Sequence, residues 1–245
     1  MTARPRRYPL LGEDDPNHIK SQRAFTIQAE QEMWDIGIPS ILRTVLPLRR
    51  SEFRKNITLG KYPFQQDHSG SMTPIKLAWK TEIQNVDFGL LFPELIEGLT
   101  DIEPSIVRIA KAAIIDLLKH GPLDKLIDTL PVLTEAIRSA LVMNNVEVAR
   151  RVLIVLRHIC TIQPGIGPDI SYYLRDIFQH LNYYFEAHKN YNDQIVYNPS
   201  LSDDLYDLID DVVKRLLQIS GNELETAEDN IKLALPTYQI NRLTI

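Results

Sequence analysis

The chain has 245 residues, of which 44% are hydrophobic and 24% are charged, and its formal net charge is −5. This length and apolar content are enough to bury a continuous core. No apolar run approaches the roughly 20 residues that cross a bilayer, and residues 1–30 lack the apolar core of a secretory signal. The single cysteine, Cys160, can form no internal disulfide. We therefore expect a cytosolic or cytoskeletal protein and exclude a membrane-spanning one.

The charge is divided unevenly along the chain. Residues 1–80 hold 13 Lys and Arg against 8 Asp and Glu, a balance of +5, whereas the remainder holds 14 against 24, a balance of −10. This asymmetry suggests a basic arm that reaches toward an anionic surface from an acidic body. An ordinary solvated tail is the alternative, because charge patterning bears on association rather than on fold.

Residues 1–52 are predicted to form an extended basic N-terminal arm. Prolines and glycines recur there at intervals that leave little room for a long helix, because proline removes a backbone donor and restricts the residue before it. Only residues 21–34, in which Phe25, Ala29 and Met33 are spaced by four, favour a short helix. The rest of the arm can be ordered only by a surface on which it lies, either its own domain or a partner.

Residues 53–245 are predicted to form one helical-repeat domain that begins with a short helix and a β-hairpin. The helix ends near Gly60, and the hairpin, at about residues 62–80, pairs residues 62–68 with residues 75–80. Gly, Ser and Pro residues between the two runs indicate the turn. We expect Trp79 to anchor the hairpin on the helices that follow.

The pattern from about residue 87 to residue 235 is helical throughout. Asp87 is placed to cap a helix over 87–99, and the next helix covers 105–120. We expect His120 and Gly121 to close it, the glycine in the left-handed conformation that other side chains disfavour. Further helices are predicted over 130–141, 145–161, 169–187, 201–219 and 223–235, and residues 236–245 should pack as an extended strap.

The helices over 130–141 and 145–161 have the most regular apolar spacing. Their connection is predicted to contain only Asn144 and Asn145, so the two helices must lie antiparallel and side by side. Leu133 and Leu156 are expected to be buried where the two apolar stripes face each other. One hairpin cannot cover both of its faces, so further hairpins must stack against it, as in a helical-repeat protein.

A search for catalytic, metal or cofactor motifs finds none that is convincing. The six histidines show no zinc-ligand spacing, and His158 and Cys160, two residues apart, point to different sides of a helix. The glycine pair Gly165 and Gly167 follows no predicted strand, which makes a phosphate-binding loop improbable. The aspartates over 203–211 alternate with apolar residues and fit the solvated face of a helix better than a calcium loop. We expect no enzyme, no cofactor and no metal.

A set of short motifs, spread from residue 53 to residue 238, resembles one known family. The motifs are Phe53-Arg54-Lys55, Gly60, Pro63, His68, Ala78-Trp79-Lys80, Glu82-Ile83, Asp87, Gly98-Leu99, Asp116-Leu117, His120-Gly121, Leu130-Pro131, Ala140-Leu141, Asn145, Val148, Val155-Leu156, His158, Tyr172-Tyr173, Asp207-Leu208-Ile209, Asn230-Ile231-Lys232 and Pro236-Thr237-Tyr238. In this order they resemble the parkin co-regulated protein family. The resemblance implies an all-α, armadillo/HEAT-like α-solenoid of stacked helical hairpins with a small β-hairpin and an extended N-terminal arm.

The same resemblance implies a structural role in the axoneme of cilia and flagella. Members of the family sit at the inner junction of doublet microtubules, where they bridge the A- and B-tubules and alternate with a small β-rich protein. The implied partners are α/β-tubulin, that β-rich protein and other axonemal proteins, with no nucleic acid and no membrane. The implied location is the cytoskeleton of the cilium or flagellum, within the cytoplasm. The alternative is a soluble cytosolic adaptor of the same fold that binds a protein partner without a microtubule role.

Basic and aromatic residues of the arm and the hairpin are the candidates for contact with tubulin or another partner. The acidic surface and tails of tubulin would attract these cations through charge-assisted contacts that weaken with salt. The candidate residues are Arg4, Arg6, Arg7, Arg49, Arg50, Arg54, Lys55, Trp79 and Lys80.

Overall fold

The computed structural model describes residues 47–67, 75–182, 184, 199–236 and 238–240, with the backbone alone for residues 199–203. The described residues belong to a compact unit that spans Val45–Ile245. The predicted helix over 21–34 and the hairpin tip at 69–74 lie outside them. Within them, the predicted all-α fold with one small β-hairpin is confirmed. No helix in the described part of the chain is both long and apolar enough to cross a bilayer.

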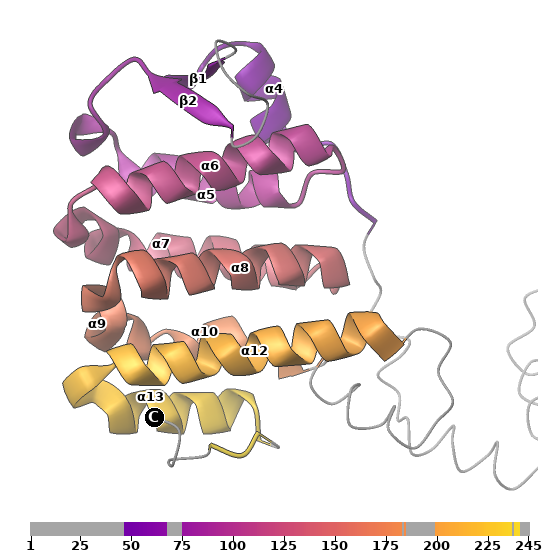
Figure 1. The fold of residues 1–245 in the computed structure, drawn as a ribbon, viewed down its shortest axis with the longest axis vertical. Helices are drawn as coiled ribbons and strands as arrows, with labels where there is room; N and C mark the ends of the chain where they lie inside the picture. Colours follow the sequence, from indigo (N-terminus) through magenta and orange to yellow (C-terminus); the bar gives the residue numbers. More distant parts are fainter. Residues whose placement is uncertain (1–46, 68–74, 183, 185–198, 237, 241–245) are drawn as a thin grey trace, which may run out of the picture. The chain divides into compact units, whose positions relative to one another are not determined.

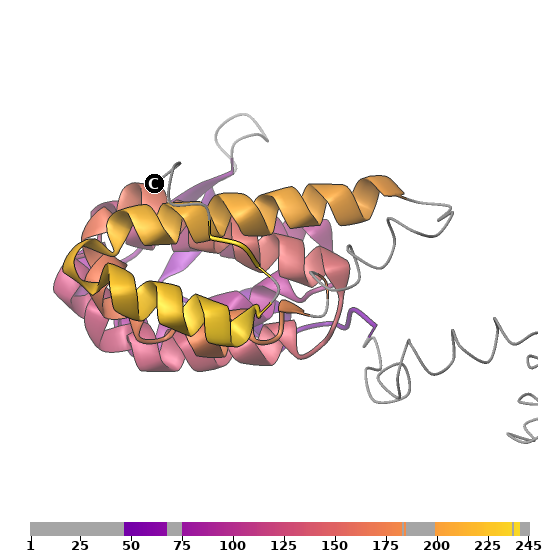
Figure 2. The same cartoon turned by 90° about the horizontal axis from the view of Figure 1, so that it is seen from below.

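The helices stack in two layers (Figure 1). They are α4 (Glu52–Thr58), α5 (Phe88–Leu99), α6 (Pro104–His120), α7 (Leu123–Leu141), α8 (Val146–Ile162), α9 (Gly167–Ser171), α10 (Leu174–Phe178), α12 (Pro199–Ile219) and α13 (Leu224–Ala234), with 3-10 turns at Ile83–Asn85, Pro164–Ile166 and Gly221–Glu223. Helices α6, α8 and α12 form one layer, and α5, α7, α10 and α13 form the other, as the view from below also shows (Figure 2). Each helical hairpin therefore buries its apolar stripe against the next one along the stack.

The β-hairpin lies at the N-terminal end of the stack. Strands β1 (Phe64–Asp67) and β2 (Lys76–Trp79) pair antiparallel, and Phe64 lies opposite Trp79. The predicted hairpin is thus confirmed, with strands somewhat shorter than the apolar runs. Strand β2 packs against α6, which places the hairpin beside the first helices of the stack.

Two of the helix starts follow from side-chain caps that the sequence indicates. The side chain of Asp87 accepts a hydrogen bond from the Leu90 N–H at the start of α5, as predicted. The side chain of Asn145 accepts from the N–H groups of Glu147 and Val148 at the start of α8. Asn144 precedes it with a φ of 50°, a left-handed conformation that asparagine tolerates better than most residues. These two residues turn the chain between α7 and α8.

The predicted start of the central hairpin at residue 130 is wrong, because α7 begins at Leu123 and continues through Pro131. Proline lacks the N–H that would bond to the preceding turn, so it is unfavourable inside a helix. Leu126 and Leu130 are both buried, and this packing keeps the first two turns helical despite the proline. Tertiary contacts here outweigh the local preference.

The continuous helix predicted over 169–187 is also wrong, because the structure breaks it into α9 and α10. At the break, Asn230 of α13 donates a hydrogen bond to the backbone carbonyl of Ser171 at 3.0 Å. The Ser171 hydroxyl donates to the Gly167 carbonyl and is also within 3.0 Å of the Ser220 hydroxyl. The backbone carbonyl at the end of α9 is therefore hydrogen-bonded by Asn230 of α13, and the Ser171 hydroxyl contacts Ser220, the residue after α12. With these partners in place, the helix ends at Ser171.

Gly121 closes α6, but not in the predicted left-handed conformation. Its φ is −82° and its ψ is 150°, which is extended backbone open to any residue. Glycine is needed for space instead, since a Cβ at this position would overlap the Phe88 ring and the Leu117 carbonyl. Glycine is needed at position 167 for the same reason, because a Cβ there would overlap the Ile219 carbonyl at the end of α12. Both glycines thus permit close approach between helices.

The predicted apolar stripes of α7 and α8 form the middle of the core. Leu133 and Leu156 are 1% and 0% exposed, as the spacing predicted. The C-terminal strap is described only in part, at residues 236 and 238–240. There Tyr238 is buried and its hydroxyl donates to Asp210 Oδ1 of α12 at 2.7 Å.

Truncating Leu156 to Ala should lower the free energy of unfolding by about 2–5 kcal/mol, because it removes buried apolar surface and leaves a cavity between the layers. Urea unfolding followed by circular dichroism measures this loss. The matched control is Ile154→Ala in the same helix, whose side chain is only half-buried on the opposite stripe and should lose far less. Equal losses for the two variants would contradict the assignment of the buried face.

Candidate partner-binding surface

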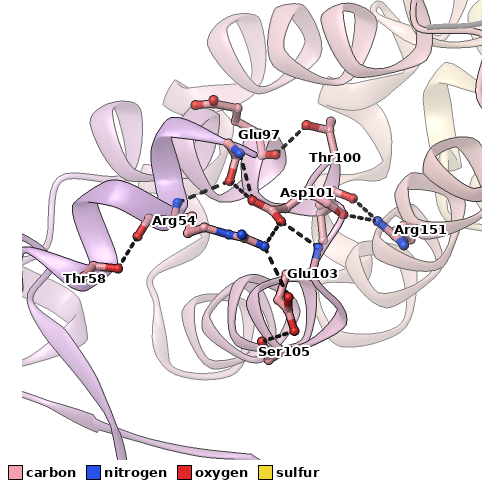
Figure 3. A network of polar contacts seen from close by, with 10 residues as sticks. Arg54, Thr58, Glu97, Thr100, Asp101, Glu103, Ser105 and Arg151 are labelled. Atoms are coloured by element: carbon pink, nitrogen blue, oxygen red, sulfur yellow. Dashed lines mark hydrogen bonds and ion pairs between the residues drawn. The ribbon is translucent and has the colours of Figure 1, made fainter. Parts of the chain in front are cut away.

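The predicted binding surface is built on α4, which is held by the buried carboxylate of Asp101 (Figure 3). Asp101 Oδ2 accepts hydrogen bonds from the Ser51 N–H at 2.8 Å and from the Ser51 hydroxyl at 2.7 Å. Asp101 Oδ1 accepts one from Arg54 Nη2 at 2.7 Å. The Asp101 side chain is 0% exposed and that of Arg54 is 22% exposed. A buried carboxylate is tolerated only when paired and hydrogen-bonded, and we call this set of contacts the Asp101 clip.

The Asp101 clip also joins the turn between α5 and α6 to α8. The Glu103 N–H donates to Asp101 Oδ1 at 2.7 Å. Arg151 of α8 donates to the carbonyls of Leu99 at 2.8 Å and Asp101 at 2.9 Å, satisfying the end of α5 (Figure 3). The Ile102 N–H donates to the Arg49 carbonyl at 3.1 Å, so the segment before α4 is attached as well.

The environment keeps Asp101 charged. Burial alone would raise the pKa of this carboxyl, but the N–H groups of Ser51 and Glu103, the Ser51 hydroxyl and the Arg54 guanidinium together hold the pKa below its ordinary value. The stability that it contributes is therefore present above the unfolded-state pKa, near 4, and is lost as the pH falls through the lower folded-state pKa.

The hairpin is anchored by aromatic packing and one polar contact. The rings of Phe53, Tyr62, Phe64 and Trp79 follow one another with centroids 5.0, 5.4 and 5.0 Å apart. The Trp79 indole N–H donates to Asp116 Oδ2 of α6 at 3.1 Å. Trp79 therefore anchors the hairpin on the helices, as expected, and its half-buried ring is largely committed to the fold.

The structure divides the candidate residues into three groups. Arg49, Arg50, Lys55 and Lys80 are exposed near α4 and the hairpin. Arg54 lies in the Asp101 clip, and Trp79 lies in the aromatic row, so both support the surface from below. Arg4, Arg6 and Arg7 lie outside the described residues. A tubulin contact for any of these residues stays a prediction.

Sequence reasoning did not find Asp101 or Arg151, the two residues that join the ends of these helices. The partners through which they join these helices lie 47 to 52 positions away in the chain, and apolar periodicity contains no information on such distant polar pairs. The available signal is local: Asp101 is one of two carboxylates, with Glu103, between two predicted helices, where a capping role is common.

The described residues contain no group of three or more His, Cys, Asp or Glu side chains that could hold a metal ion. His158 is half-buried on α8, whereas Cys160 is buried in the core. Burial raises the pKa of the Cys160 thiol to about 12, so this cysteine stays protonated and behaves as a small core residue. A shallow hollow of about 430 Å³ lies between the start of α5 and α7, lined by Val86, Phe88 and Lys125 among others.

The fold defines a structural protein of stacked helical hairpins with a small β-hairpin at one end. A sequence model of the family described as Parkin co-regulated protein matches residues 51–240. A Mus musculus protein, the Parkin coregulated gene protein homolog, is 29% identical over 242 residues, which cover 96% of this chain and 98% of the mouse protein. The chain belongs to the parkin co-regulated protein family, and the resemblance seen in its motifs is confirmed.

Replacing Asp101 with Ala should lower the free energy of unfolding by about 3–5 kcal/mol at neutral pH, since Arg54, the buried N–H and hydroxyl of Ser51 and the part-buried Glu103 N–H lose their acceptor. Chemical denaturation at neutral pH measures the loss. The matched control is Ser105→Ala, because this hydroxyl bonds only to Glu103 at 3.3 Å at the edge of the same network, and the change should be within about 0.5 kcal/mol. A loss below about 1 kcal/mol for the Asp101 variant would contradict the structural role of the clip.

His158 should make the protein less stable in mild acid. Burial and the nearby cations Lys111, Arg157 and Lys119 hold its pKa below the ordinary value, so the folded state disfavours the protonated ring. Stability is therefore retained above the unfolded-state pKa, near 6.5, and falls as the pH drops below it. His158→Gln should lose less stability than the parent chain between about pH 7.5 and about pH 5.

Urea unfolding at the two pH values measures this difference. His120→Gln, at an exposed position at the end of α6, is the matched control and should keep the pH dependence of the parent chain. If both variants keep the full pH dependence of the parent chain, the loss of stability in acid arises from groups other than His158.

Proposed function

We propose that this chain is a structural microtubule-associated protein of the ciliary or flagellar axoneme, which bridges the A- and B-tubules at the inner junction of doublet microtubules. The observation that carries the proposal is the family match, which runs from residue 51 to residue 240 and so includes the hairpin and every helix of the stack. The relative from mouse aligns over nearly the full length of both chains. We therefore expect the family's role to apply to the whole unit rather than to one motif.

The physical properties of the surface support this proposal. Arg49, Arg50 and Lys55 are exposed on or just before α4, and the Asp101 clip holds their backbone in place. A preorganised row of cations loses little freedom on binding an acidic surface such as tubulin, and it accelerates association. A stack of rigid helical hairpins also provides the extended faces that a bridging protein needs. We infer that the role is architectural rather than catalytic.

Reversing the exposed charges should weaken attachment to doublet microtubules. The variant Arg49→Glu/Arg50→Glu/Lys55→Glu leaves the clip intact, because Arg49 contributes only its carbonyl and Lys55 pairs only with exposed Glu52 at 2.6 Å. Each lost cation contributes roughly 0.2–1 kcal/mol, so the three together should reduce retention on salt-washed axonemes by about tenfold. Quantitative blotting of axonemal and detergent-soluble fractions measures the effect.

Two further variants make this test specific. Arg175→Glu, at an exposed position of α10, is the matched charge control and should be retained like the parent chain. Deletion of residues 1–46 keeps the Arg49 carbonyl and Ser51 in place, so the stack should fold while retention falls through the loss of Arg4, Arg6 and Arg7. A parent chain that leaves entirely with the soluble fraction would instead favour the cytosolic adaptor.

A further inference from the structure

The outer face formed by α6 and α8 contains a positively charged patch that the fold itself does not use. The two helices lie side by side in one layer of the stack (Figure 1). On α6, Arg108, Lys111, Ile115 and Lys119 recur at spacings of three and four, so they share the stripe opposite the core residues. On α8, the stripe of Arg150, Ile154, Arg157 and His158 does the same. We call these eight residues the α6/α8 patch.

Three cations of the α6/α8 patch, Lys111, Arg157 and Lys119, lie close enough to His158 to act on it electrostatically. Burial lowers the pKa of the half-buried Lys111 ammonium, and the nearby Arg157 lowers it further. The lowered pKa of His158, caused first by burial, also reflects the charges of Lys111, Arg157 and Lys119. Side chains from both helices therefore share one positive field.

Few of the described carboxylates pair with the cations of the α6/α8 patch, so its positive charge is only weakly neutralised. Within the described part of the chain, Arg108, Lys111 and Lys119 form no ion pair. The two arginines of the patch on α8 pair only across to α12 within the described residues, with Arg150 at 3.8 Å from Asp204 and Arg157 at 3.9 Å from Asp211. These long, solvent-exposed pairs contribute little.

A gain in stability does not explain the charge of Lys111. Partial burial and the neighbouring Arg157 both disfavour the charged form of this side chain, which is why its pKa is lowered. The positive charge is also confined to this part of the layer, because the neighbouring α12 presents the aspartates at 204, 207 and 211. Charged residues in an unfavourable environment that bring no benefit to the fold are typical of binding sites.

Two isoleucines give the patch an apolar floor. Ile115 and Ile154 are half-buried and lie within the same stripes as the cations, away from the core side of their helices. An apolar strip that is bordered by charged side chains on two parallel helices matches the way an amphipathic helix is bound in a groove. Because the flanking side chains are cationic, a helix that binds here must be acidic.

We propose that the α6/α8 patch binds an acidic amphipathic helix of a partner protein, whose apolar side chains cover Ile115 and Ile154 while its carboxylates pair with Lys111, Lys119 and Arg157. The inference is independent of the microtubule role. A long polyanion such as a nucleic acid fits less well, because it makes no use of the isoleucines and would be repelled by the acidic α12 and by the net charge of −5. The stripe from Arg108 to Lys119 is about three helical turns long, so a protein segment of roughly 18 residues would cover it with about one turn to spare at each end.

Fluorescence anisotropy with a designed probe tests this proposal on the full chain. The probe is a dye-labelled peptide of about 18 residues in which leucines occupy one helical face and glutamates the flanks. A second peptide has the same composition in scrambled order, and a third replaces every glutamate with glutamine. Binding should require both the charge and the helical pattern, and it should weaken as salt is raised.

The variants separate binding from stability. Lys111→Gln/Arg157→Gln should bind the probe about tenfold more weakly, which corresponds to about 1.4 kcal/mol for the two lost charged contacts together, and Lys111→Glu/Arg157→Glu should abolish measurable binding. The glutamine variant should be at least as stable as the parent chain, because it relieves the repulsion at Lys111. Arg175→Glu on α10 is the matched control and should bind like the parent.

The proposal is supported only if the patterned peptide binds and both the scrambled peptide and the glutamine peptide bind much more weakly. Equal binding of the patterned and scrambled peptides would overturn the amphipathic helix as the ligand, leaving only nonspecific charge attraction. Equal weakening by Arg175→Glu would overturn the assignment to this face. Concentration-dependent self-association that is abolished by the Lys111 and Arg157 substitutions would identify a second copy of the chain as the occupant and would also overturn it.

Discussion

The stack depends on one constraint: an antiparallel pair of amphipathic helices cannot bury both of its faces alone. Helices α7 and α8 lie in the middle of the stack, and their buried residues contact the hairpins on either side. Each neighbouring hairpin has the same need, so the domain grows by repetition until a terminal element covers the last exposed stripe. At the N-terminal end, α4 and the β-hairpin provide that cover, and near the other end Tyr238 packs back onto α12.

The Asp101 clip shows how a terminal element is attached when little apolar surface is available. Helix α4 has only seven residues, and Phe53 is its one buried side chain. A charged network with a fully buried acceptor fixes this helix against α5, α6 and α8. The paired groups of this network hold α4 in place beneath the exposed cations around it, although the buried Arg54 Nε has no hydrogen-bond partner among the described residues.

The distribution of charge along the chain differs from its distribution in space. By sequence, the basic part is the first 80 residues and the remainder is acidic. In the folded unit, α6 and α8 from the acidic remainder present a positive face, while α12 presents a negative one in the same layer. Exposed cations therefore lie in two separate places on one stack, around α4 and on the outer face of α6 and α8.

Features that depend on neighbouring residues could be predicted from the sequence alone. The apolar stripes, the Asp87 cap and the β-hairpin all follow from spacing and local chemistry, and the motifs were sufficient to recognise the family. Features that depend on distant residues could not be predicted in this way. Asn230 donates to the backbone carbonyl at the end of α9, packing keeps α7 helical through Pro131, and the Phe88 ring leaves no room for a Cβ at Gly121. Asp101 binds Arg54, so the Arg54 side chain is no longer part of the exposed candidate surface. These contacts join positions far apart in the chain, and apolar periodicity contains no information about them.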